Sequence, residues 1–228
     1  ANQAVAAKRS EAVTNFIGAI GNDEAGEMMR ELLSEEGIEL AGVQTLEKQA
    51  TGQAYIIVDD QGENSIMIHS GANNAFTPKQ VQAHTDLIKA SDFIIAQFES
   101  TLESTVEAFT IAREAGVKTI LNPAPALENV PEELLKVTDM IIPNETETEI
   151  LTGIKVTDEA SLKAAADHLH QLGIEAVIIT IGSKGAFYDV QGRSGIVPAF
   201  KVNAVDTTAA GDTFIGAMSS ILAKDFST

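Results

Sequence analysis

Short apolar runs alternate with helical patterns along most of the chain, and this alternation restricts the possible folds more than any other feature. The apolar runs, rich in β-branched residues, lie at 15–21, 92–98, 117–122, 139–144 and 175–182. Such runs are typical of central strands in a covered parallel sheet. The helical patterns lie at 23–37, 77–90, 100–116, 131–137 and 158–173. The order predicts an α/β fold with a doubly wound, mainly parallel sheet flanked by helices.

One segment breaks the alternation. Residues 51–74 hold two strand-like runs around the turn-rich sequence DDQGEN, with no helical pattern between them. This pattern predicts a small β-hairpin lid that stands apart from an α/β domain made of residues 1–50 and 75–228. A second hairpin is expected at 185–200, after the last parallel strand.

The strands of the expected lid carry apolar residues that the main sheet cannot cover, namely Ile56, Val58, Ile66 and Ile68. Exposed apolar strands of this kind usually mark a contact surface. We therefore expect them to pack against a second copy of the protein, giving a homodimer through the lids, or to close over a bound ligand.

Charge and cysteine content exclude several classes of function. The chain has 33 acidic and 15 basic residues, a formal net charge of -18, which repels nucleic-acid backbones and anionic membrane surfaces. No apolar run approaches the roughly 20 residues of a membrane span. The absence of cysteine excludes disulfides, thiolate catalysis and cysteine-ligated metals, and it agrees with a cytoplasmic location. We expect neither nucleic acid nor membrane as a partner.

The segment AVDTTAAGDTF, residues 204–214, places small residues before an aspartate that opens an apolar helical run. Ligands of doubly wound sheets bind near helix N-termini, whose N–H groups are unpaired. Ala209, Ala210 and Gly211 would let a charged ligand approach the backbone, and Asp212 could take a proton from an attacking hydroxyl. The alternative is that Asp212 only caps the helix.

Two further motifs follow apolar strands. PNETETE, residues 143–149, places Asn144 and Glu147 three residues apart, where a carboxylate could reach a metal-bound phosphate or simply cap a helix. TIGSKG, residues 180–185, has glycines at 182 and 185, which suits a turn around a nucleotide or a plain turn into the hairpin. Neither a P-loop nor a dinucleotide-binding fingerprint is present. All three motifs fall at the same end of strands in one sheet.

The order of ANQA, GEN, HSGAN, LNPAPA, PNETE, TIGSKG and AVDTTAAGDTF resembles that of the ribokinase-like sugar kinase family, over nearly the whole chain. The resemblance implies an ATP-dependent kinase that phosphorylates the primary 5-hydroxyl of D-ribose to give ribose 5-phosphate. It implies that Asp212 is the catalytic base and that the N–H groups of Ala209, Ala210 and Gly211 form the anion hole for the transferred phosphoryl group.

The resemblance also implies the binding residues. Asn2 and Glu99 would bind ribose hydroxyls, although Glu99 could equally be a helix N-terminal carboxylate. Asn144 would contact the nucleotide phosphates, and Glu147 would act on Mg²⁺ through water. Potassium, the monovalent cation of the family, would be held by Asp206 and the carbonyl of Thr208. The ATP site would be lined by Thr180, Gly182, Ser183, Lys184, Gly185 and Gly211.

The sequence departs from the family at both ends. The family's first strand with its substrate-binding aspartate, the Gly-Gly-Lys-Gly before ANQA, and the segment that completes the adenine pocket and the cation site are missing. We therefore expect the natural polypeptide to extend beyond Ala1 and Thr228, and we expect the present chain to bind ATP and ribose poorly.

Three alternatives remain open at this point. The chain could be a kinase for another sugar or a nucleoside, a truncated fragment that binds a ligand without catalysis, or an α/β dinucleotide-binding enzyme. The lack of Gly-x-Gly-x-x-Gly after the first strand counts against the last of these.

Overall fold

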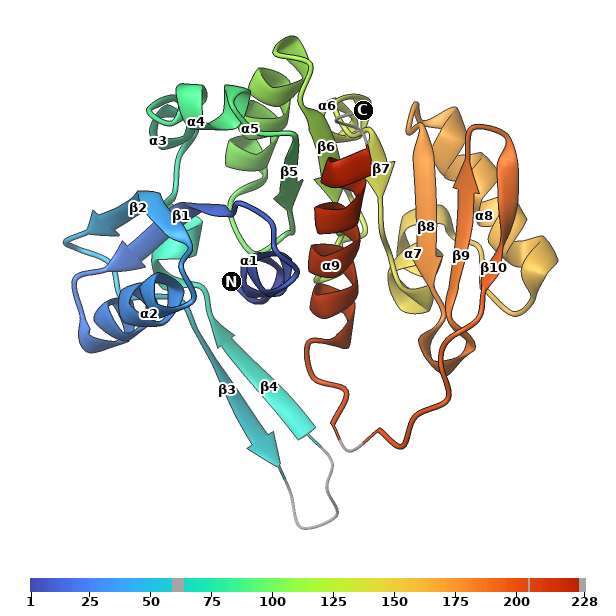
Figure 1. Ribbon diagram of the computed structural model, residues 1–228, viewed down its shortest axis with the longest axis horizontal. Coiled ribbons are helices and arrows are strands. Elements are labelled where there is room, and N and C mark those ends of the chain that lie inside the picture. Colours follow the sequence, from blue (N-terminus) through green and yellow to red (C-terminus); the bar gives the residue numbers. More distant parts are fainter. Residues whose placement is uncertain (59–63, 205, 226–228) are drawn as a thin grey trace.

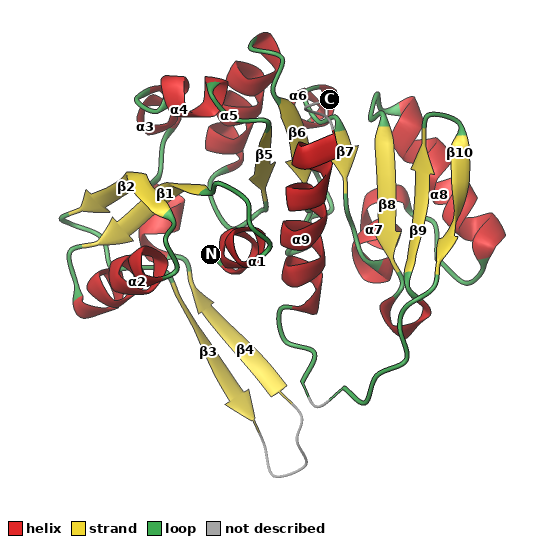
Figure 2. Cartoon of the chain, in the orientation of Figure 1, coloured by secondary structure: helices red, strands yellow, loops and turns green. Residues whose placement is uncertain are grey.

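The protein has an α/β fold in which helices cover both faces of a central sheet (Figures 1 and 2). The computed structural model describes residues 1–58, 64–204 and 206–225. The strands are β1 (Asn15–Gly21), β2 (Glu39–Leu46), β3 (Gln53–Val58), β4 (Asn64–His69), β5 (Phe93–Ala96), β6 (Lys118–Leu121), β7 (Met140–Ile141), β8 (Ala176–Thr180), β9 (Ala186–Val190) and β10 (Arg193–Val197). The α-helices are α1 (Asn2–Arg9), α2 (Glu24–Glu35), α3 (Pro78–Gln82), α4 (Thr85–Lys89), α5 (Leu102–Glu114), α6 (Glu132–Lys136), α7 (Glu145–Thr152), α8 (Glu159–Gln171) and α9 (Ala210–Asp225), and 3₁₀ turns lie at Gly71–Ala75 (η1) and Gly182–Lys184 (η2).

The central sheet has six strands in the order β10-β9-β8-β7-β6-β5. Neighbouring strands from β5 to β8 are parallel, and β9 and β10 add an antiparallel hairpin at one edge. The mainly parallel sheet and the second hairpin are thus confirmed. The first expected strand, β1, lies outside this sheet, because it pairs in parallel with β2 in a separate two-stranded sheet.

The two faces of the central sheet are covered by different helices. On one face Phe109, Leu134 and Leu169 are fully buried against strand residues such as Val177. On the other face α9 lies across the strands, and its Ile215 packs on Ile120 and Ile142. This places the first turn of α9 near the carboxyl ends of the parallel strands, where ligands of such sheets bind.

Helix α1 crosses α9 at very close range near the middle of the molecule (Figure 1). A Cβ atom added to Gly216 of α9 would lie 2.5 Å from the backbone oxygen of Gln3 and 2.7 Å from the backbone nitrogen of Ala7. A glycine is therefore required at this crossing, because any side chain would push the two backbones apart. Gly216 lies about one helical turn after Asp212, so the close approach brings α1 beside that aspartate.

The hairpin expected between residues 51 and 74 is present as β3 and β4, which pair in antiparallel register and project from the rest of the molecule (Figure 1). Most of its expected turn, residues 59–63, and the side chains of Ile56, Val58 and Ile66 lie outside the described part of the chain. Of the remaining expected contact residues, Ile68 is exposed.

The base of the hairpin is tied to β1 and α2 through Asp23. This side chain accepts hydrogen bonds from the backbone nitrogen of Gly26 at 2.9 Å, where it caps α2, and from the backbone nitrogen of Thr51 at 2.8 Å. The Thr51 hydroxyl also donates to Asp23 at 2.5 Å, and the Gly21 nitrogen donates to that hydroxyl at 2.9 Å. The bond from the Thr51 hydroxyl, followed by the two backbone bonds, lowers the pKa of the Asp23 carboxyl.

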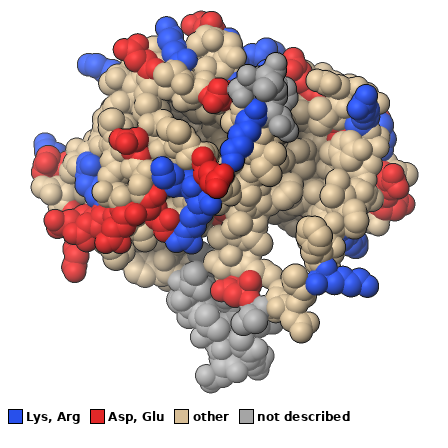
Figure 3. Space-filling model, viewed as in Figure 1, with Lys and Arg blue, Asp and Glu red and all other residues tan. Residues whose placement is uncertain are grey.

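The acidic character of the chain is visible on its surface. Figure 3 shows acidic side chains gathered over α2, the helix whose outer face carries several glutamates. None of the helices in the described part of the chain has the length and apolar character needed to cross a bilayer.

Candidate active site

A small polar cavity of about 150 Å³ lies where α1, the N-terminal turn of α9 and the ends of β5 and β6 meet. It is lined by Ala1, Asn2, Gln3, Gln97, Glu99, Asn122, Ala124 and Asp212. Drug-sized ligands occupy roughly 300–1,000 Å³ in mainly apolar pockets. The cavity is smaller and is lined by amides and carboxylates, so it suits a small molecule with many hydroxyl groups.

The cavity brings together three residues expected to act on the substrate. Asn2, Glu99 and Asp212 are far apart in sequence but line the same space. The Asp212 carboxylate accepts a hydrogen bond from Asn2 Nδ2 at 3.0 Å and one from Gln3 Nε2 at 2.9 Å. Asp212 is the third residue of α9 and lies inside its first turn, so it does not occupy the N-cap position of its own helix.

Five residues of the cavity were not expected from the sequence: Ala1, Gln3, Gln97, Asn122 and Ala124. Gln97 directly follows β5, and Asn122 directly follows β6. Both are therefore polar side chains at the carboxyl ends of apolar parallel strands, and that position alone could have marked them as candidates.

The backbone just before Asp212 is shaped for an anion. Ala209 has a positive φ of 57°, and α9 begins at the next residue. Within the described ranges, the N–H groups of Gly211 and Asp212 have no protein acceptor, as is normal for the first turn of a helix. Unpaired N–H groups and the positive end of the helix dipole favour a bound phosphoryl group there.

Asn144 and Glu147 form a reciprocal capping box at the start of α7. Glu147 oxygens accept bonds from the Asn144 backbone nitrogen at 2.8 Å and from Asn144 Nδ2 at 2.9 Å, and Asn144 Oδ1 accepts from the Glu147 nitrogen at 2.8 Å. Glu147 is buried, and this desolvation raises the pKa of its carboxyl. Each oxygen accepts one bond and keeps a second acceptor site, which suits a water that bridges to Mg²⁺.

The turn after β8 lies beside this capping box. Asn144 and Thr180 form a parallel β-bridge, and the Thr180 nitrogen donates to the Pro143 oxygen at 2.9 Å. The Lys184 ammonium lies 3.9 Å from a carboxylate oxygen of Glu145. Gly182, Ser183 and Lys184 are exposed, so ligands can reach the turn from solvent.

The two glycines of this turn should respond very differently to alanine. Gly185 has φ 115°, and an added Cβ would lie 1.9 Å from the Val197 oxygen, whereas Gly182 has φ 56° with open space around it. We expect Gly185→Ala to lower the free energy of unfolding by more than about 2 kcal/mol, because strain and overlap add. Gly182→Ala should cost about 1 kcal/mol, from the left-handed backbone alone. Urea unfolding of both variants checks this, and equal losses would contradict it.

Asp206 and Thr208, the residues expected to hold a monovalent cation, form a tight turn before α9. Asp206 Oδ1 accepts a bond from the Thr208 nitrogen at 2.8 Å. Bonds from the Thr208 hydroxyl and backbone nitrogen lower the pKa of the exposed Asp206 carboxyl, which stays ionised. An ionised carboxylate and a carbonyl are oxygen ligands that fit a hard cation. No group of three or more His, Asp or Glu residues suited to a metal occurs in the described part of the chain.

Known proteins have sequences similar to that of this chain. A bifunctional ribokinase/ribose-5-phosphate isomerase A of Fructilactobacillus sanfranciscensis is 51% identical over 227 residues, which span 100% of this chain and 42% of the relative. A ribokinase of Staphylococcus aureus is 45% identical, over 98% of this chain and 73% of the relative. The chain thus spans less than half of the bifunctional relative and about three quarters of the second one.

The fold is also found in solved structures. The structure of Arabidopsis thaliana ribokinase complexed with ribose and ATP superposes with a TM-score of 0.93 at 29% identity, over 98% of this chain and 73% of that one. The sequence signature of the pfkB family of carbohydrate kinases matches residues 1–227. Because this signature spans nearly the whole chain and the similar proteins are ribokinases, the chain belongs to the pfkB family of carbohydrate kinases.

Proposed function

We propose that the protein is an ATP-dependent kinase that transfers the γ-phosphoryl group to the 5-hydroxyl of D-ribose. The observation that carries the proposal is the meeting of Asn2, Glu99 and Asp212 around one small polar cavity at the N-terminus of α9. The similar proteins described as ribokinases, one of them with ribose and ATP bound, support the choice of substrates.

In this mechanism Asp212 accepts the proton of the hydroxyl as its oxygen attacks the γ-phosphorus. The bond from phosphorus to the bridging oxygen of ATP breaks, and ADP leaves with the electron pair. Backbone N–H groups of Ala209 and Gly211 hold the negative charge on the equatorial oxygens, whereas the N–H group of Ala210, expected to join them, donates to the Thr207 oxygen at 3.2 Å. Asn2 and Glu99 hold other hydroxyls of the sugar and fix the angle of attack.

The nucleotide would lie over the ends of β7 and β8. Asn144 would contact the phosphates, and the turn from Thr180 to Gly185 would line the rest of the site, since the two are joined by a β-bridge. Mg²⁺ would neutralise phosphate charge when bound, with Glu147 ordering water toward it. Asp206 and the Thr208 carbonyl would supply two of the oxygens for K⁺ and thereby steady the loop that leads to Ala209.

A coupled assay of ADP release tests the proposed function. The complete natural polypeptide is supplied with ATP, Mg²⁺ and K⁺ and screened with ribose, deoxyribose, fructose and nucleosides. The highest kcat/KM is expected for ribose. A preference for another sugar or a nucleoside would replace the substrate but keep the chemistry. Calorimetric binding of ribose without any ADP release would instead identify a ligand-binding protein without catalysis.

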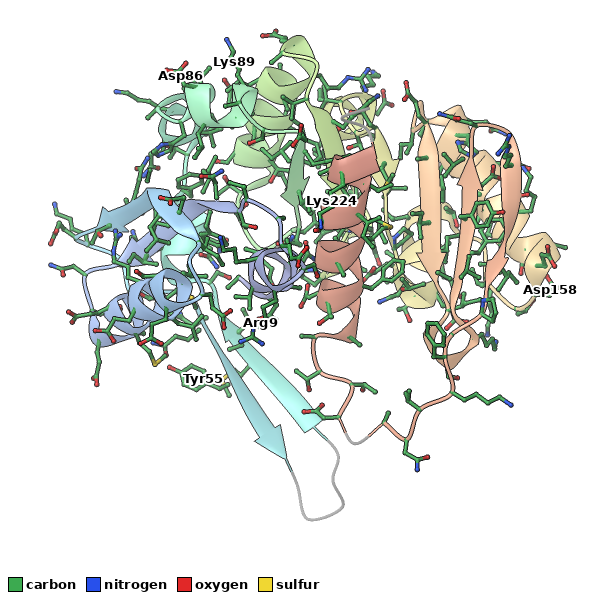
Figure 4. All side chains as sticks on the ribbon, viewed as in Figure 1. Arg9, Tyr55, Asp86, Lys89, Asp158 and Lys224 are labelled. Carbon is green, nitrogen blue, oxygen red and sulfur yellow. The ribbon has the colours of Figure 1, made fainter. Side chains whose placement is uncertain are left out.

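We also propose that the protein is a cytoplasmic homodimer joined through the β3–β4 hairpins. Ile68, exposed by 60%, lies on one face of this hairpin. Tyr55 and Met67 pair across the hairpin and share the other face, where they are exposed by 53% and 61%, and Figure 4 shows Tyr55 pointing away from β3. Paired hairpins would cover this apolar surface. We expect Met67→Glu to shift the sedimentation coefficient from dimer to monomer. A strict monomer for the parent at micromolar concentration would contradict the proposal.

A further inference from the structure

A chain of side-chain amides runs from the protein core to the carboxylate of Asp212. Asn122 Nδ2 donates to the backbone oxygen of Ile142 at 2.9 Å, and Gln3 Nε2 donates to Asn122 Oδ1 at 3.0 Å. The same Gln3 nitrogen donates to Asp212 Oδ1 at 2.9 Å, and Gln97 donates to the Gln3 oxygen. Gln3 thus bonds to all three polar neighbours through its amide group.

The direction of every bond in this chain is set by two groups that can only accept. The Ile142 carbonyl has no proton to donate, so the NH₂ group of Asn122 must face it. The oxygen of Asn122 then faces Gln3, which must present its own NH₂ group. The Asp212 carboxylate requires the same orientation of Gln3, so both ends of the network agree.

The position of Gln3 is as fixed as its orientation. Its side chain is buried, with 6% of the residue exposed, whereas Asn2 is exposed. The close crossing at Gly216 seats the backbone of Gln3 directly on α9, one turn from Asp212. A sugar entering the cavity can compete for the amide of Asn2, but it cannot easily displace the buried amide of Gln3.

We propose that Gln3 is a positioning residue for Asp212, with Asn122 acting through it. The bond from Gln3 holds Oδ1 in place, so that Oδ2 stays turned toward the substrate when Asn2 changes its partner. This proposal deepens the proposed kinase function and rests on it. Misplacing a catalytic group by about 1 Å can cost on the order of a hundredfold in rate.

The test replaces Gln3 by methionine, which has a similar length and no donor. We expect Gln3→Met to lower kcat for ribose about tenfold to a hundredfold while KM for ribose and ATP change little, because the interaction matters in the transition state. Asn122→Leu should lower kcat less. The double variant should be no slower than Gln3→Met alone, because Asn122 acts only through Gln3.

Losses that multiply in the double variant would overturn the proposal, as would an unchanged kcat in Gln3→Met. If Gln3→Met does not fold, Gln3→Glu replaces it, since it keeps the shape and the acceptor for Gln97 but sets a carboxylate against Asp212. A folded Gln3→Glu with parental kcat would equally overturn the idea.

Gln44→Met is the matched control. Gln44 is a half-buried glutamine of β2 whose amide group exchanges hydrogen bonds with Gln80, outside the cavity. Its kcat should equal that of the parent. Asp212→Asn distinguishes a failure of this proposal from a failure of the proposed kinase function. Parental turnover in Asp212→Asn would defeat the kinase mechanism. An inactive Asp212→Asn together with parental turnover in Gln3→Met would defeat only the role of Gln3.

Discussion

Replacing Asp212 by asparagine should lower turnover of ribose by on the order of 10² to 10⁴ and leave the fold intact. The asparagine oxygen can still accept the bond from Gln3, so the shape of the site persists. The amide cannot take up the hydroxyl proton, however, and the attacking oxygen is no longer activated. The affinity for ATP should change little, because the N–H groups before Asp212 are untouched.

Steady-state kinetics, ATP binding by calorimetry and thermal unfolding of the complete natural polypeptide measure these three quantities. Asp158→Asn is the matched control, because Asp158 caps α8 on the far side of the central sheet from α9 and asparagine caps equally well (Figure 4). It should match the parent in all three measurements. Near-normal turnover in Asp212→Asn would end the assignment of Asp212 as the base, and an unfolded variant would make its role structural.

The sequence was most informative where one residue pattern admits one local structure. The apolar strands β5, β6 and β8 and the capped helices α5 and α8 follow from periodicity and capping residues. β2 was missed because it has polar residues along its length and few buried positions, so it lacks a continuous apolar run. The helix expected at 77–90 is divided into α3 and α4 at His84, where the backbone leaves the helical range.

The residues of the candidate site also fall into those that the sequence could predict and those that it could not. Asp212 could be found because its motif combines a helix start with small residues, and Asn2 and Glu99 followed from the family resemblance. Gln97 lies in no motif, and Gln3 and Asn122 lie in the motifs ANQA and LNPAPA, which by themselves give these two amides no role. An amide becomes part of a site only through the partners that the fold places around it, and the partners of Gln3 lie in three distant segments of the chain.

Replacing Gly211 by valine should abolish most of the activity by a different route from Asp212→Asn. An added Cβ at Gly211 meets no atom within 4 Å, and its backbone needs no glycine-specific φ. The variant should therefore fold as well as the parent, since valine is no worse than glycine inside a helix. The new side chain would instead occupy the space in which the phosphoryl group approaches the N–H groups. Losing one such donor typically lowers kcat by about 10² to 10³.

ATP binding distinguishes the two variants. Gly211→Val should weaken ATP binding as well as turnover, and Gly211→Ala, with its smaller side chain, should fall between it and the parent. Asp212→Asn should lower turnover alone. If Gly211→Val bound ATP and turned over ribose like the parent, the phosphoryl group would not pass the N-terminus of α9, and the free N–H groups there would be only the ordinary end of a helix.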